Sequence, residues 1–221
     1  AFEALRKEYP YLPGDMFVAK SGNIFTRKQW KDLPWADVIN DSDKRKGIIC
    51  DIFDELDDEI LHNSALYSII NEAKPDIVID CINTATSFAY LDIYNTTRKV
   101  KNEIIDGNLS IDSIEKMMTN MYIPQLIRHI QILNKALNDV KAKIYLKIGT
   151  TGTGGMGLNI PYTHSEERPS RVLLSKSAVA GAHSLLLFLM ARTPGGPLVK
   201  EIKPAATIAW KRIAYDTVMR K

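Results

Sequence analysis

Cysteine, net charge and long apolar runs are all scarce in this chain, and each shortage excludes a class of protein. The 221 residues contain only Cys50 and Cys81, too few for a disulfide framework and without the spacing of a metal site. A formal net charge of +3 is too small to indicate a nucleic acid or an anionic membrane as partner. The most apolar stretch, residues 178–191, is shorter than the roughly 20 residues that cross a bilayer. We therefore expect a reduced, cytoplasmic protein with no metal, no nucleic acid and no membrane.

Apolar runs typical of strands alternate with helical patterns along the chain. Helices are predicted over 1–9, 34–40, 65–73, 92–118, 120–139 and 173–192, and strands over 15–19, 47–53, 76–83 and 142–149. Residues 198–210 are predicted to form a last strand that runs into a loop. This alternation is typical of βαβ units around a parallel sheet. No repeat or linker interrupts it. The sequence therefore predicts one α/β domain over 1–221, with a doubly wound parallel sheet and helices on both faces.

The glycine-rich segment at 147–157 contains the GxGxxG of dinucleotide-binding turns, at Gly152, Gly154 and Gly157. A predicted strand precedes these glycines. A dinucleotide-binding turn also needs a helix whose N-terminus holds the pyrophosphate. The segment after Gly157 contains Pro161 and has no helical periodicity, so we predict no such helix there. We interpret the segment as a loop at the end of a strand, where glycine lets the backbone approach a ligand closely. A loop in which glycine serves only tight turns is the alternative.

Several segments, taken in order, resemble the extended short-chain dehydrogenase/reductase superfamily, which includes the nucleotide-sugar epimerases and dehydratases. GIICDIF resembles the third strand of that family, KPDIVIDCINTAT the fourth, KIYLKIGTTGTGGMG the fifth and EIKPAATIAW the sixth. TNMYIPQLIRHI is similar to the opening of the long fourth helix, with Asn120 at its structural asparagine. PYTHSEERPSRVLLSKSAVAGA is similar to the segment that carries the Tyr-x-x-x-Lys of the family. The resemblance implies a Rossmann-like domain that binds NAD or NADP.

Two departures from the family stand out. Its phosphate-binding turn lies between the first strand and the first helix, and this chain begins in what would be that helix. We therefore expect the first strand and its glycines, and the C-terminal substrate region, to be absent. Lys176 matches the lysine of the family, but Val172 stands in place of the tyrosine that exchanges a proton with the substrate oxygen. Valine can neither donate nor accept that proton.

The resemblance implies roles for residues on both sides of the expected active site. Lys176 would bind the nicotinamide ribose, and Thr150 or Thr151 would hold the substrate oxygen. Tyr162 and His164 are candidates for the missing acid or base. Packing of Tyr162 at the sheet edge and solvation of His164 are the alternatives.

The resemblance also implies contacts to the rest of the cofactor. Asp51 would accept a hydrogen bond from the adenine amino group, with capping of the turn at DELDDE as its alternative role. The other implied contacts are at Ile52, Cys81, Asn83 and Pro204.

These expectations favour an NAD(P)-dependent oxidoreductase, or an epimerase/dehydratase-like enzyme, acting on a small hydroxylated or carbonyl substrate with a non-standard active site. A catalytically inactive NAD(P)-binding sensor or scaffold is the alternative, and a purely structural α/β subunit is a third interpretation. The family also pairs its fourth and fifth helices between subunits. We therefore expect a homodimer through 120–138 and 174–192, unless segment 92–118 covers their apolar faces.

Overall fold

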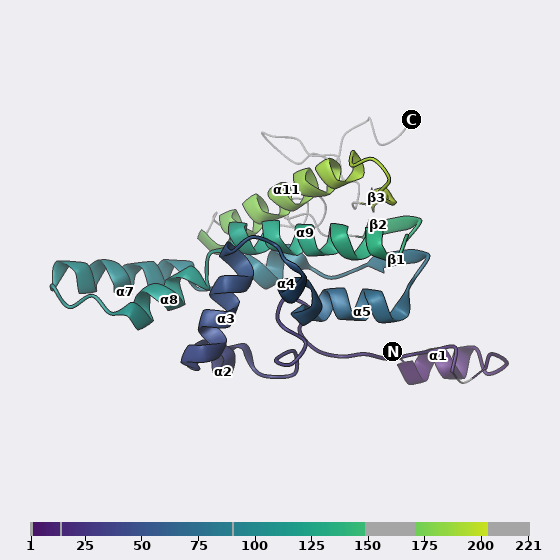
Figure 1. The fold of residues 1–221 in the computed structure, drawn as a ribbon, viewed down its shortest axis with the longest axis horizontal. Coiled ribbons are helices and arrows are strands. Elements are labelled where there is room, and N and C mark those ends of the chain that lie inside the picture. Colours follow the sequence, from purple (N-terminus) through teal and green to yellow (C-terminus); the bar gives the residue numbers. More distant parts are fainter. Residues whose placement is uncertain (1, 14, 90, 149–170, 203–221) are drawn as a thin grey trace, which may run out of the picture.

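The computed structural model describes residues 2–13, 15–89, 91–148 and 171–202, in which helices pack on a small parallel sheet (Figure 1). The elements run in the order α1 (Phe2–Glu8), α2 (Trp35–Asn40), α3 (Ser42–Phe53), α4 (Asp58–Asn63), α5 (Ala65–Ala73), β1 (Ile77–Asp80), α6 (Thr84–Ala89), α7 (Ile93–Ile105), α8 (Ile111–Met118), α9 (Tyr122–Asp139), β2 (Ile144–Ile148), α11 (Arg171–Ala191) and β3 (Leu198–Ile202). The predicted α/β class with a parallel sheet is confirmed.

The sheet has the order β1-β2-β3, and both strand pairs are parallel. Ile144 pairs with Ile77 on one side and with Leu198 on the other, which fixes the register of all three strands. Parallel neighbours require crossover connections. Helices α6 to α9 lie between β1 and β2, and α11 lies between β2 and β3. The carboxyl ends of the strands therefore meet at one edge.

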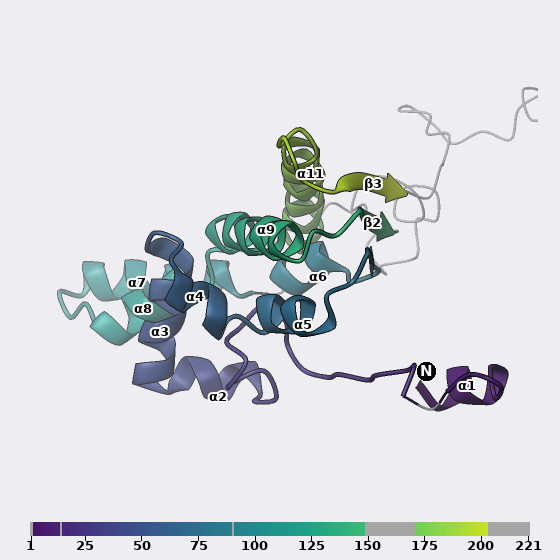
Figure 2. The ribbon, with the colours of Figure 1, turned by 45° about the vertical axis from the view of Figure 1, so that its right-hand side comes forward.

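In the part of the chain that the structure describes, helices cover one face of the sheet. Tyr145 and Lys147 of β2 are fully buried, and the neighbouring Val78 and Val199 pack against the same core. Figure 2 shows α5, α9 and α11 together on one side of the strands. The alternate positions carry Ile79 and Ile202, which are exposed. The predicted second layer of helices is thus not seen among the described residues.

Helical spacing of apolar residues explains the main core. Leu126, Ile130, Leu133 and Leu137 follow one another at intervals of four, three and four residues along α9, and all four are buried. They pack toward α5, α11 and β2, so the helix predicted over 120–139 forms the centre of the domain. The predicted helices over 34–40 and 65–73 are confirmed, and segment 92–118 forms the helical pair α7 and α8.

Two predicted strands are wrong. Residues 15–19 form no strand, and 47–53 belong to α3. The side chain of Asp41 accepts hydrogen bonds from the backbone N–H groups of Asp43 and Lys44, which caps α3 and starts the helix well before the apolar run. Within α3, Arg45 is buried and its guanidinium lies 2.8 Å from the carboxylate of Glu115 on α8. These contacts select a helix over a strand.

Helix α11 is longer than the apolar stretch predicted at 178–191. Its segment Leu174–Ala191 is long and apolar enough to cross a membrane, by length and composition only. The core helix of a soluble protein passes the same test, and here Val179, Leu187 and Met190 are buried in the two core clusters. The part of α11 that faces the domain therefore behaves as a core helix.

Candidate functional site at the carboxyl edge of the sheet

A buried polar network lies at the carboxyl edge of β1 and β2. The ammonium of Lys147 is 2.9 Å from a carboxylate oxygen of Asp80, and the Tyr145 hydroxyl donates to the same oxygen at 2.6 Å. The Lys147 side chain is only 1% exposed. Asp80 and Lys147 are direct partners in the strand register, so the parallel pairing itself brings their side chains together.

Burial and hydrogen bonding act against each other on the groups of this network. Burial works to raise the pKa of Asp80, but the Tyr145 hydroxyl and the Lys147 ammonium outweigh it and hold that pKa below its usual value. Burial, followed by the charge of Asp80, raises the pKa of Tyr145. Asp80 is therefore an ionised carboxylate at neutral pH, and Tyr145 keeps its proton.

Lys147 also fixes the chain that leaves β1. It donates to the carbonyl oxygen of Ile82 at 2.6 Å and lies 3.4 Å from the Thr84 hydroxyl at the start of α6. The Asp80 carboxylate accepts from the Ile82 N–H at 2.8 Å. Between these anchors lie two residues predicted to contact a cofactor, the exposed Cys81 and Asn83. The network thus holds the turn that carries them.

A second polar cluster lies at the start of α11. The Ser175 hydroxyl, which is buried, lies 3.2 Å from the Tyr94 hydroxyl and 3.1 Å from the Tyr122 hydroxyl. The guanidinium of Arg171 lies over the Tyr94 ring, 5.2 Å from its centroid. Hydrogen bonding to Ser175 and then to Tyr122, with the charge of Arg171, lowers the pKa of Tyr94. The cluster offers a phenol that gives up its proton more readily than an isolated tyrosine.

Lys176 follows Ser175 on α11 and is half-buried. Helix α11 packs against α6, which begins directly after Asn83, so the structure brings together the two elements that carry Asn83 and Lys176. Val172, at the position where the resemblance leads us to expect a tyrosine, is exposed at the second position of α11. The direction of the Lys176 ammonium toward the threonines of the glycine-rich loop stays a prediction.

The remaining expected site residues fall into two groups. Thr150, Thr151, Tyr162, His164 and Pro204, together with the glycine-rich loop, lie outside the described residues. Asp51 and Ile52 lie on α3 rather than on a strand.

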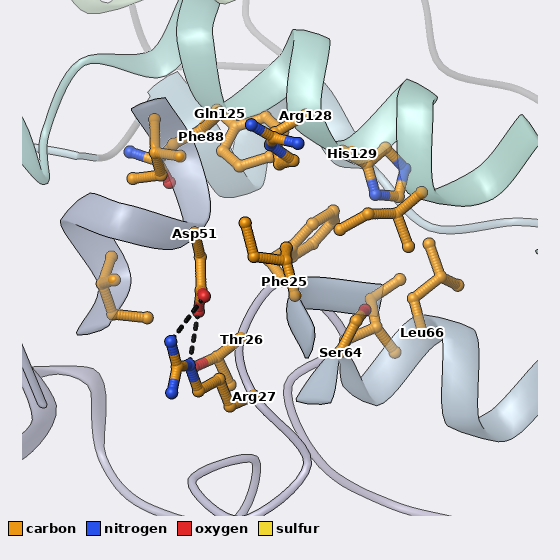
Figure 3. Close-up of a pocket in the computed structure, with 15 residues that line it drawn as sticks. Phe25, Thr26, Arg27, Asp51, Ser64, Leu66, Phe88, Gln125, Arg128 and His129 are labelled. Carbon is orange, nitrogen blue, oxygen red and sulfur yellow. Dashed lines mark hydrogen bonds and ion pairs between the residues drawn. The ribbon is translucent and has the colours of Figure 1, made fainter. Parts of the chain in front are cut away.

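Asp51 takes part in an ion pair instead. Both carboxylate oxygens of Asp51 accept from Arg27, each at 2.7 Å (Figure 3). The strand that would have placed Asp51 beside an adenine is absent, so the reason for that role is gone. The contact with adenine itself stays a prediction. The helix at DELDDE is capped by Asp57 and not by Asp51, because the Asp57 side chain accepts from the Ile60 N–H at 2.8 Å.

A groove lies beyond the carboxyl end of β1. It is lined by Ile82, by Ser87, Phe88 and Leu91 from α6 and the turn after it, and by Trp35, Gln125 and residues 22–25. Its volume is about 530 Å³. Pockets for organic ligands enclose roughly 300–1,000 Å³ and are mostly apolar. The groove therefore matches an organic ligand in size and position, because open parallel sheets bind ligands outside the carboxyl ends of their strands.

Sequence reasoning missed both polar clusters. Asp80 and Lys147 had a signal, since each is a charged residue within an otherwise apolar strand. Ser175, Tyr94 and Tyr122 had none, because they come from three helices whose packing no local pattern reveals. Comparisons of the chain with protein-family models, with curated proteins and with solved structures found no match. The family resemblance therefore stays a prediction from the sequence.

Proposed function

We propose that this domain is the cofactor-binding part of an NAD(P)-dependent oxidoreductase, or of an epimerase/dehydratase-like enzyme, acting on a small hydroxylated or carbonyl substrate. The observation that carries the proposal is the start of α11, where Ser175 joins two tyrosines next to Lys176. This helix follows β2, so its first turns belong to the carboxyl edge of the sheet. The proposal includes a doubly wound, Rossmann-type sheet as the fold of the whole domain.

The described residues fit a nicotinamide dinucleotide in two respects. The groove beyond β1 has the volume and apolar lining of an organic ligand site. Lys176 lies on α11, which packs against the helix α6 that follows the turn with Cys81 and Asn83. The three N–H donors of its ammonium suit a pair of ribose hydroxyls. When bound, the nicotinamide would supply or accept a hydride. Asn83, Lys176 and the groove would hold and orient it.

Tyr94 would supply the acid or base that Val172 cannot. Ser175 hydrogen-bonds the hydroxyls of both Tyr94 and Tyr122, Arg171 lies over the Tyr94 ring, and these groups lower the pKa of Tyr94. A lowered pKa makes the phenol a better proton donor to a substrate oxygen and brings that pKa closer to neutral pH, which general acid–base catalysis favours. Tyr94 thus joins the earlier candidate Tyr162, and Thr150 or Thr151 would hold the substrate oxygen.

Calorimetric titration with NAD⁺, NADH, NADP⁺ and NADPH tests the proposal, on the longest natural chain that contains these residues. We expect saturable binding of one of the pairs. Lys176→Met should weaken it about tenfold or more, since a hydrogen bond from a charged group contributes about 1.5–3 kcal/mol. The exposed Lys200→Met on β3 is the matched control. No binding, or equal weakening by both variants, would overturn the proposal.

A turnover assay separates the enzyme from its alternative, a catalytically inactive NAD(P)-binding sensor or scaffold. Hydride transfer should be followed at the nicotinamide absorbance with a panel of small alcohols, aldehydes and ketones. Tyr94→Phe should lower kcat and leave cofactor affinity unchanged. Tyr67→Phe, which removes a hydroxyl bonded to Asp139 2.8 Å away, is the control. Binding without turnover of any substrate would favour the sensor or scaffold.

We also propose a cytoplasmic homodimer that buries the outer face of α11. Leu174, Leu185, Phe188 and Leu189 are exposed along that helix, and Ile123 and Ile127 are exposed on the adjoining α9. Helices α7 and α8 leave these side chains exposed, and Figure 1 shows the pair projecting away from α11. Sedimentation should give a dimer at micromolar concentration, and Leu185→Glu should give a monomer. A wild-type monomer, or partition of the wild type into lipid vesicles, would refute this assembly.

A further inference from the structure

A small pocket with an unpaired buried cation lies between α3, α5, α9 and the segment at residues 24–27 (Figure 3). Its volume is about 50 Å³. A cavity needs about 10–15 Å³ to hold one water molecule, so this pocket has room for a group of several non-hydrogen atoms. It shares Ile24, Phe25, Phe88 and Gln125 with the groove beyond β1, and its lining also includes Asp51 and Ile52 of α3.

Arg128 is the cation. It is 8% exposed, and its Nη2 donates to the backbone oxygen of Asp54. Its Nε and Nη1 are buried without a hydrogen-bond partner. Burial lowers the pKa of Arg128, but a guanidinium stays protonated in proteins. A buried charge with unmade hydrogen bonds destabilises a fold by several kcal/mol, so two free donors on such a group indicate a missing acceptor.

The nearest carboxylate is already used. Asp51 faces the pocket from α3, but both of its oxygens accept from Arg27. The carboxylates of Asp54 and Asp57 act on Arg128 only through longer-range attraction, since no carboxylate among the described residues forms an ion pair with it. The lining itself contains two guanidinium groups and one carboxylate, and that carboxylate is bonded to Arg27.

Two further polar groups line the pocket without partners. The Thr26 hydroxyl and the His129 Nε2 are both buried and unbonded. The pKa of His129 falls to about 3 because of burial and the neighbouring His183, so the ring is neutral at physiological pH. A neutral histidine can donate one hydrogen bond and a threonine hydroxyl can donate one more. Arg128 and Thr26 therefore offer free donors to the cavity, and Asp51, the carboxylate of its lining, is bonded to Arg27.

We propose that this pocket binds the carboxylate group of a small monocarboxylic acid. The anion accepts hydrogen bonds from the free Nε or Nη1 of Arg128 and from the Thr26 hydroxyl. The remaining lining is largely aliphatic and aromatic, with Ile48, Ile60 and Ile132 among its members, and receives a short apolar stem. This lining favours a carboxylate with an alkyl group over phosphate, whose oxygens would all need donors.

Calorimetry and thermal denaturation with acetate, propionate, butyrate and inorganic phosphate test the proposal. We expect saturable binding of one of the three carboxylates and a melting temperature that rises with its concentration, because a ligand that binds only the folded state stabilises it. Arg128→Met should reduce affinity at least tenfold, and Thr26→Val should reduce it less. Arg98→Met, on the exposed face of α7, is the matched control and should have no effect.

Three outcomes would overturn the proposal. The first is no binding of any of the carboxylates by the wild type up to tens of millimolar. The second is phosphate binding in preference to every carboxylate. The third is carboxylate binding that Thr26→Val and Arg128→Met both leave unchanged. If Arg128→Met does not fold, Thr26→Val and NMR shifts of the His129 ring on addition of ¹³C-labelled carboxylate decide. Unshifted ring signals would count against the site.

Discussion

Replacing Lys147 by methionine removes the one cation of the buried network at the carboxyl edge while keeping most of the side-chain volume. Asp80 would then stay 11% exposed, with only Tyr145 and the Ile82 N–H as described partners. Removing one partner of a buried ion pair costs about 3–5 kcal/mol, because the other charge is left uncompensated. The two bonds that remain to Asp80 favour the lower end of that range. Urea denaturation followed by circular dichroism measures this loss.

The double-mutant cycle isolates the pair from the packing. If the cost of Lys147→Met comes from a stranded carboxylate, then Asp80→Asn should remove much of that cost. The double variant should then be destabilised by less than the sum of the two single variants. A cost below about 1 kcal/mol for Lys147→Met, or strict additivity in the cycle, would refute the reasoning.

The same pair predicts a pH dependence. The pKa of Asp80 is lower in the folded protein than its unfolded value of about 3.9, so the stabilisation that Asp80 contributes is complete above that value. The stabilisation is lost as the pH falls through the lower, folded pKa. Lys147→Met removes one cause of the low pKa, so acid unfolding of this variant should begin at higher pH than that of the wild type. An unchanged midpoint of acid unfolding would show that Lys147 does not lower the pKa of Asp80.

Three other substitutions test the described contacts. Asp51→Ala should destabilise the fold by about 1–3 kcal/mol, because it leaves Arg27, whose side chain is 16% exposed, without its carboxylate partner. We expect NAD(P) affinity to stay the same. Weaker cofactor binding at unchanged stability would instead support a contact between Asp51 and adenine. Ser64→Ala should cost about 1 kcal/mol because the Ser64 hydroxyl caps α5. Ser68→Ala, which removes only a bond to the exposed Glu72, should cost less in the same melts. Leu126→Ala should cost about 2–5 kcal/mol, since Leu126 is 0% exposed, whereas the exposed Leu109→Ala should stay near zero; similar losses in both would contradict the described core.

Long periodic segments could be predicted from the sequence, and short apolar ones could not. Helices α5 and α9 each present a buried stripe over nine residues or more, which local periodicity reveals, whereas α11 is apolar nearly all round and is predicted by its length and composition. GIICDIF is too short to distinguish a strand from a helix by its pattern. These residues form a helix because Asp41 caps its N-terminus and because Arg45 bonds to Glu115, which lies far along the chain on α8. No short window contains that second contact.

The carboxyl edge shows which part of a site local sequence can reveal. Asp80 and Lys147 are neighbours only because β1 and β2 are parallel and in register, yet each is conspicuous as a charge in an apolar strand. Ser175, Tyr94 and Tyr122 are ordinary residues at the starts of three helices. Their convergence depends on how α7, α9 and α11 pack, so only the three-dimensional structure discloses it.

Arg128 has an ordinary position in the sequence and unusual surroundings in the fold. Its place on α9, directly between Ile127 and His129, is no more unusual in the sequence than that of any helical arginine, which normally reaches solvent at the end of an apolar stem. Here α3 and residues 24–27 close over it, and Arg27 takes the carboxylate that would have been its natural partner. The unusual feature is thus not the arginine itself but the ion pair that already joins Asp51 to Arg27. Freeing Asp51 with Arg27→Met should let it pair with Arg128, and this competing anion should weaken carboxylate binding in the pocket.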